Sequence, residues 1–210
     1  MDTIKGFFLF PFYSAFQYTR FTLSSVISLP FFLLEFIKTS GKTRIFKDHS
    51  ILFKFTQQWP LGTYFFDGIV GFFAPYSASI SPHVESCSVD DVTVSMTEMP
   101  WLKNPFNSIH AVALANLGEL ASGLSMVLSM QQNKGIRGIP KEINIEFFKK
   151  SRGTIYASST SGVGNITKDC DLIAEAILTN KKKEVVAKVK VTWSMQIKNK
   201  DNNEEDKKKQ

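Results

Sequence analysis

The sequence feature that most limits the fold is a long apolar helical repeat, from about Ile109 to Met130, followed directly by strand-like segments. Apolar side chains recur along this repeat at spacings of three and four residues, which places them on one wide helix face. Asn107 or Ser108 is expected to cap its start by accepting a hydrogen bond from a free backbone N–H. A helix with so wide an apolar face must be covered by other elements. The face consists of Ile109, Val112, Ala113, Leu117, Leu120, Leu124, Val127 and Leu128.

Four strand-like segments follow the helix, at about residues 139–149, 153–161, 170–179 and 184–197. Two of them alternate apolar and polar side chains, which predicts strands with one buried and one exposed face. A polar connection at residues 180–183 predicts a hairpin, and the run from Val89 to Met96 predicts a further strand before the helix. The pattern therefore predicts an α+β domain in which an antiparallel sheet wraps around a long central helix, the layout of the hot-dog fold.

The N-terminal third is rich in aromatic residues, because 11 of the 24 Phe and Tyr residues lie between positions 6 and 38. Two apolar stretches, 6–19 and 21–34, flank Arg20, and each is shorter than the roughly 20 residues that span a bilayer as a helix. Aromatic and basic residues suit a membrane interface, so we expect a membrane-associated intracellular protein, on the cytoplasmic face or in a mitochondrion. Two alternatives stay open: a helical extension packed on its own domain or on a dimer partner, and a cleaved targeting segment.

We expect three parts in the chain: an N-terminal helical, aromatic-rich extension over residues 1–60, a hot-dog domain over 61–197, and a disordered tail over 198–210. Before the domain, an amphipathic pattern predicts a short helix at 46–58, which Trp59-Pro60 ends because the residue before proline avoids the helical region. A second helix is expected over Leu61 to Phe73, where Pro75 stops it. The tail carries charges of both signs without an apolar run.

Composition excludes several classes of protein. Hydrophobic residues make up 43% of the chain, which is enough for a packed core. The net charge of +6 is spread along the sequence rather than concentrated, so no nucleic-acid partner is expected. Two cysteines cannot build a disulfide framework, and their spacing to each other and to the three histidines fits no zinc finger. No metal or cofactor is implied.

Polar residues at a distinctive spacing surround the start of the predicted central helix. Asn104 lies six residues before His110, and Glu119 follows nine residues after it. With this spacing the segment from Asn104 to Gly123 resembles the signature of the PaaI-like hot-dog thioesterases, in a less characterised branch that carries Glu as the acidic residue. The resemblance covers roughly residues 62–197. It implies a homodimer, or a dimer of dimers, that hydrolyses acyl-CoA thioesters and belongs to lipid metabolism.

Thioester hydrolysis needs a polarised carbonyl and an activated water or a carboxylate nucleophile. The resemblance implies that Glu119 is the general base or nucleophile and that Asn104 and His110 shape and polarise the pocket. Backbone N–H groups of Ala111 and Val112 lie in the first helical turn, where the positive end of the helix dipole favours a developing oxyanion.

Two further features of the helix concern Glu119. Small residues, among them Ser122 and Gly123, leave a slot for substrate beside its carboxylate. Nine residues of helix rise about 13.5 Å, so the first-turn N–H groups and the carboxylate of one chain are too far apart to serve one carbonyl. The site therefore requires a second protomer to supply one of them, which agrees with the dimer-interface sites of the family.

Basic residues near a predicted strand end, Lys149, Lys150 and Arg152, are expected to meet the phosphates of coenzyme A, unless they form an ordinary solvated strand end. Two positions depart from the family pattern. Val112 belongs to an Ala-Val pair where the family usually has Gly-Gly, and Pro140 stands where some members use a serine to place water. These departures leave open an alternative, a non-catalytic hot-dog module that binds acyl chains, lipids or partners at a membrane.

Overall fold

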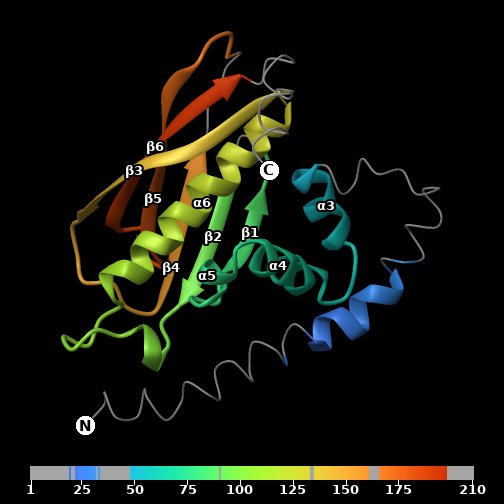
Figure 1. Cartoon of the computed structure of the whole chain (residues 1–210). Coiled ribbons are helices and arrows are strands. Elements are labelled where there is room, and N and C mark those ends of the chain that lie inside the picture. The colour runs from blue at the N-terminus through green and yellow to red at the C-terminus, as the bar shows by residue number, and fades with distance from the viewer. Residues whose placement is uncertain are drawn as a thin grey trace, which may run out of the picture.

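The fold is that of a computed structural model, which describes residues 19, 22–31, 33, 48–89, 91–132, 135–160 and 166–197. Its centre is one six-stranded antiparallel sheet with the strand order β1-β2-β4-β5-β6-β3 (Figure 1). The pairing confirms the predicted antiparallel sheet, with one strand more than the sequence indicated. The strands are β1 (His83–Cys87), β2 (Val92–Thr97), β3 (Ile136–Phe147), β4 (Thr154–Thr160), β5 (Cys170–Asn180) and β6 (Val185–Ile197).

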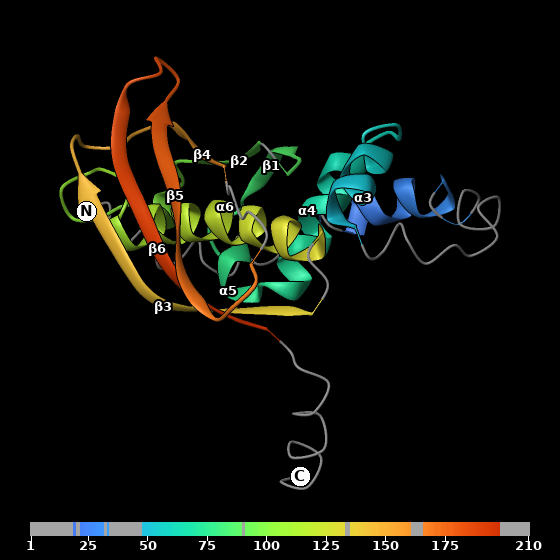
Figure 2. The ribbon, with the colours of Figure 1, turned by 90° about the horizontal axis from the view of Figure 1, so that it is seen from above.

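One long helix, α6 (Ala111–Gln132), lies along the concave face of this sheet, and the strands curve around it (Figure 2). Its inward side chains, such as Leu117 and Ala121, are fully buried against the buried face of the strands. This arrangement of an antiparallel sheet around a central helix confirms the predicted hot-dog fold. The other helical elements are α3 (His49–Thr56), α4 (Gly62–Phe73), α5 (Pro75–Ala78) and the short 3-10 helix η1 (Pro100–Leu102).

Glycine allows α6 to approach the sheet closely. A Cβ added to Gly118 would lie 2.4 Å from the Cγ2 atom of Val189 on β6, so no larger residue fits there without a shift. The close approach leaves the helix buried over most of its surface. Val112 is an exception, because its side chain is 54% exposed rather than part of the core face that the periodicity predicted.

Strand β1 was missed by the sequence reasoning, which placed the first strand at residues 89–96. Only Val84 and Cys87 of β1 are buried apolar residues, and an irregularity in its pairing between Val84 and Ser86 breaks the alternation. Besides its pairing with β2, strand β1 is held by hydrogen bonds to α4. The Asp67 carboxylate accepts a 2.8 Å hydrogen bond from the Val84 N–H and lies 2.7 Å from Nδ1 of His83. This long-range tether leaves no local signal in the sequence.

Helix α3 lies within the stretch assigned to the N-terminal extension, yet it packs into the core. Leu52 and Phe53 are each 3% exposed, and the Phe53 ring meets the ring of Phe66 on α4 edge-on at 5.0 Å. The Asp48 carboxylate caps α3 by accepting from the N–H groups of Ser50 and Ile51. Most of the aromatic segment 6–38 and all of the charged tail 198–210 lie outside the described residues.

Among the described residues, one helix is long and apolar enough to cross a membrane, the stretch 111–131 of α6. Its central place under the sheet accounts for that apolar character, because 61% of the stretch is buried within the domain. The helical segment Thr22–Phe31 is apolar but shorter.

Candidate active site

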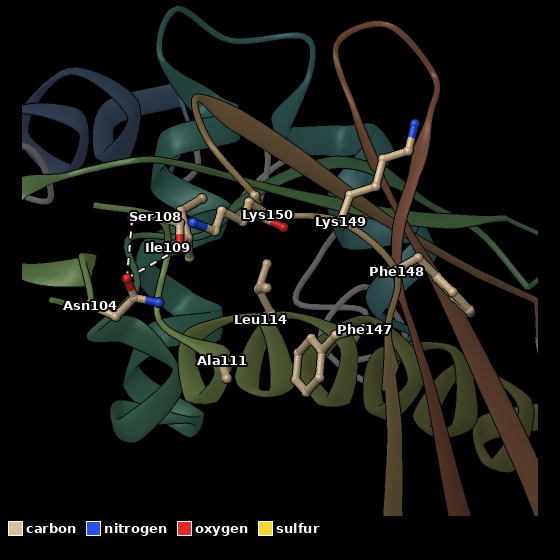
Figure 3. A pocket seen from close by; sticks show the side chains of 10 residues that line it. Asn104, Ser108, Ile109, Ala111, Leu114, Phe147, Phe148, Lys149 and Lys150 are labelled. Carbon is tan, nitrogen blue, oxygen red and sulfur yellow. Dashed lines mark hydrogen bonds between the residues drawn. The ribbon is translucent and has the colours of Figure 1, made fainter. Parts of the chain in front are cut away.

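A hollow of about 300 Å³ opens between the start of α6 and the end of β3. Four of the residues predicted to bind or act on substrate, Asn104, Ala111, Lys149 and Lys150, line this hollow together, although they come from three separate segments (Figure 3). Apolar side chains of Leu114, Phe147 and Phe148 form another part of its wall, and Ser108, Ile109 and Ser151 complete the lining.

Asn104 organises the loop that leads into α6. Its side-chain oxygen accepts a hydrogen bond from the Phe106 N–H at 3.0 Å. It also accepts from both the N–H and the hydroxyl of Ser108 at 3.2 Å (Figure 3). Its amide nitrogen takes no part in these three bonds. Arg152 secures the same loop from outside, because its Nε donates to the Asn107 carbonyl at 3.0 Å. Asn104 therefore fixes the loop with one end of its amide and keeps donor capacity at the other.

The start of α6 is capped by His110, not by Asn107 or Ser108 as the sequence suggested. His110 Nδ1 accepts a hydrogen bond from the Val112 N–H at 3.2 Å, as the side chain of an N-cap residue does. The Val112 N–H is thereby engaged within the chain. Within the ranges that the structure describes, the Ala111 N–H has no partner, which leaves it as the first-turn donor available to a ligand in the hollow.

The two lysines of the hollow differ in their surroundings. Lys149 Nζ lies 2.9 Å from Glu184 on β6, in an exposed ion pair of the kind that contributes little stability. Hydrogen bonds from Asn180 and then Lys149 lower the pKa of the Glu184 carboxyl, which favours its charged form. Lys150 forms no ion pair among the described residues. Lys150 is thus the lysine of the hollow that can bind an anion without competition from a neighbouring carboxylate.

Glu119 lies two turns further along α6 and does not line the hollow. Partial burial raises the pKa of its carboxyl, because the charged form loses hydration there. Gly123 leaves space next to it, since a Cβ at that position would meet nothing closer than Glu119 Oε1 at 3.7 Å. Ser122 is fully buried and donates its hydroxyl to the Glu119 backbone carbonyl at 3.0 Å. The carboxylate therefore lies next to Gly123, while the Ser122 side chain is turned to the helix backbone.

The two halves of the predicted site are well separated within one chain. Eight residues of helix between Ala111 and Glu119 correspond to about 12 Å along the axis of α6. The sheet edge beside the hollow is open in the described part of the chain, because β3 pairs with β6 on one side only. Ile143 and Phe147 of β3 pair with buried positions of β6, yet their side chains are 48% and 49% exposed.

Two polar groups near the site were not anticipated. Ser151, which is 2% exposed, lines the hollow with a buried hydroxyl that has no partner within the described ranges. Trp193 on β6 lies beside Gly123, close to Glu119. Its buried indole N–H also has no hydrogen-bond partner within the described ranges. Neither carries a local sequence signal, since serine after a basic pair and tryptophan in an alternating strand are both common.

Comparison with known proteins agrees with this fold. One solved structure, a structural-genomics target, superposes with a TM-score of 0.60 at 24% identity, over 71% of this chain and 99% of that one. A Pseudomonas aeruginosa protein named as a probable thioesterase gives 0.56 at 19% identity, over 63% and 93%. The PaaI protein of the E. coli phenylacetic acid degradation operon gives 0.50 at 14% identity, over 61% and 94%. At these identities the likeness establishes the fold.

The chain is thus a hot-dog-fold protein that resembles PaaI-like thioesterases in structure. Residues 62–195 match the family model described as "Domain of unknown function (DUF4442)", and the chain belongs to this family. No curated protein matches the chain.

Proposed function

We propose that this protein is an acyl-CoA thioesterase whose active site forms between two copies of the chain. The observation that carries the proposal is the gathering of Asn104, the unpartnered Ala111 N–H and two lysines around one hollow, with Glu119 about 12 Å away on the same helix. Donors for a thioester carbonyl and a base with a raised pKa are both present, and a partner copy supplies the base to the hollow.

The proposed reaction follows from these groups. The Ala111 N–H and the Asn104 amide donate to the thioester oxygen, aided by the positive end of the α6 dipole. Glu119 from the second copy takes a proton from a water molecule, whose oxygen forms a bond to the carbonyl carbon. When the C–S bond breaks, the coenzyme A thiolate receives that proton from Glu119. The products are a carboxylic acid and free coenzyme A.

The open edge of β3 supports the pairing of two copies. A bare edge strand of 12 residues with half-exposed apolar side chains invites association, and closed two-fold dimers are the commonest solution. Val112, 54% exposed at the start of α6, adds to the apolar surface that a second copy would cover. The apolar wall of Leu114, Phe147 and Phe148 favours a fatty acyl group over a small polar one.

The test is release of free thiol from acyl-CoAs of increasing chain length, with the full chain and its Glu119→Gln variant. Loss of a general base or nucleophile should lower turnover by at least about 100-fold, while circular dichroism shows an unchanged fold. Glu175→Gln, an exposed-face residue of β5 that pairs with Lys188, is the matched control and should keep full activity. Equal turnover by wild type and Glu119→Gln would contradict the proposal.

A second candidate, a non-catalytic module that binds acyl groups, is favoured by two positions. The Val112 N–H is engaged by His110, and Pro140 has no hydroxyl to place a water molecule. Under this alternative the wild type releases no thiol, and Glu119→Gln leaves acyl-CoA affinity almost unchanged.

We also propose that the protein works at a membrane surface. Three aromatic side chains around the α4–α5 junction, Phe72, Phe73 and Tyr76, are 71–78% exposed, and the helical segment Thr22–Phe31 exposes Leu23 and Val26. Large exposed aromatic groups suit the lipid interface.

The full chain should pellet with liposomes, and Phe72→Ser with Phe73→Ser should reduce the bound fraction. Deletion of residues 1–47 tests the aromatic extension and spares the α3 core contacts. A full chain that stays in the supernatant would refute membrane association, and equal pelleting of all three proteins would refute contact through these two regions.

A further inference from the structure

Trp193 on β6 presents a buried hydrogen-bond donor that packing does not explain. Its side chain is 7% exposed, and its indole N–H is buried without a partner among the described residues. A buried donor that forms no hydrogen bond loses its hydration without compensation, so native proteins rarely keep one without a use. Phenylalanine would fill part of the same space without that cost. The N–H itself therefore calls for an explanation.

The orientation of the ring indicates where this donor acts. The Cε3 edge of the ring faces β3, because Cε3 lies 3.4 Å from the position that a Cβ on Gly138 would occupy. The sulfur atoms of Met130 and Met195 also lie close to that position. The opposite edge faces α6, because Cζ2 lies 3.9 Å from the position of a Cβ on Gly123. The indole nitrogen is attached to the ring carbon next to Cζ2. It therefore belongs to the edge near α6 and not to the edge near the methionines.

The Glu119 carboxylate approaches the same position on α6. Its Oε1 atom is 3.7 Å from the place of a Cβ on Gly123, which Trp193 Cζ2 approaches within 3.9 Å. Because Gly123 has no side chain, no Cβ stands at the point that the carboxylate and the indole edge both approach. A carboxylate is the strongest acceptor that a protein side chain offers to an indole N–H.

We propose that Trp193 is a positioning residue for Glu119: a rotation of the glutamate side chain past Gly123 brings one carboxylate oxygen to the indole N–H, which is unpartnered in the described part of the structure. The other oxygen is then free to face the hollow of the partner copy and to take the proton from water. This role rests on the proposed thioesterase function for its catalytic consequence, but the hydrogen bond itself can be tested without turnover.

The direct test is the indole N–H signal of the full-length protein in ¹⁵N-edited NMR. The chain has three tryptophans, so its three indole signals can be assigned with Trp59→Phe, Trp101→Phe and Trp193→Phe. A charged acceptor moves an indole proton further downfield than a neutral one. The Trp193 signal should therefore lie furthest downfield in the wild type, less so in Glu119→Gln, and least in Glu119→Ala. The Trp59 and Trp101 signals should not move.

An isosteric replacement connects the bond to activity. Substitution of Trp193 by benzothienylalanine keeps the bicyclic shape and removes the N–H, so the fold is preserved even where Trp193→Phe fails to fold. A hydrogen bond to the charged carboxylate lowers its pKa, so the isostere should move the acidic limb of the pH–rate profile to higher pH. We expect kcat to fall about tenfold while KM stays constant.

The outcomes separate this inference from the function on which it rests. An absence of thiol release by wild type, with the ordered NMR shifts present, would overturn the thioesterase and retain the Trp193–Glu119 bond. A Trp193 signal that is the same in wild type, Glu119→Gln and Glu119→Ala would overturn the bond, whatever the activity.

Discussion

At the scale of single residues, the burial of Glu119, the proposed catalytic base, lowers the stability of the fold that holds it. Burial raises its pKa above the unfolded value, so the folded state binds the proton more tightly than the unfolded state. Stability therefore falls as pH rises from the unfolded pKa through the folded pKa, and stays lower above it. Glu119→Gln, which carries no charge, should melt at a higher temperature than wild type at pH 8 and at nearly the same temperature at pH 4. Melting curves at both pH values check this, and a Gln variant less stable than wild type at pH 8 would contradict it.

A second residue, Lys150, tests how the substrate is recognised. Lys150 is the lysine of the hollow without an ion pair among the described residues, and the proposed function gives it a contact with the coenzyme A phosphates. One such exposed contact is worth about 1 kcal/mol, or about fivefold in affinity. Lys150→Ala should raise KM for acyl-CoA by about fivefold and leave KM for the matching acyl-pantetheine, which lacks the phosphates, unchanged. Lys182→Ala, in the exposed β5–β6 hairpin, is the control. An equal rise in KM for both substrates would show that Lys150 does not bind the phosphates.

At the scale of elements, the first turn of α6 offers a way to remove one backbone N–H. Ala111 is the first residue of the helix, where proline is tolerated because its N–H would have no helical partner. Ala111→Pro should therefore keep the fold and the melting temperature but remove the proposed oxyanion donor, lowering kcat by about 100-fold or more. Ala111→Gly, which keeps the N–H, should retain most activity. Full activity of the proline variant would exclude this N–H from catalysis.

The elements also show which features a sequence can predict. The boundaries of α6 and of β4, β5 and β6 agree with their predicted ranges within two residues, because each carries a strong period of its own. Strand β1 was missed because a distant carboxylate, that of Asp67, holds it. Asn104 was predicted from its place in a known motif, and Lys149 and Lys150 from their place near a strand end; that all three line one hollow comes from the fold. The place of Trp193 beside Glu119 could not be foreseen, since it depends on how α6 lies over β6 at Gly123.

At the scale of the whole molecule, one copy holds two half-sites that cannot meet. The hollow at the start of α6 contains the donors and cations, and the carboxylate lies further along the helix, next to Gly123. The bare edge of β3 and its half-exposed Ile143 and Phe147 provide the surface through which two copies could complete each other. Under the proposed function, assembly and catalysis are inseparable, and the activity belongs to the pair of copies.

The most direct test of this account is complementation between two inactive variants. Ala111→Pro lacks the donor and Glu119→Gln lacks the base, so neither homodimer has a working site. If equal amounts are mixed and allowed to exchange subunits, half of the dimers are mixed, and each contains one intact site. The mixture should recover about a quarter of wild-type thiol release. If activity stays at the level of the separate variants after mass spectrometry confirms exchange, the site does not form between two copies.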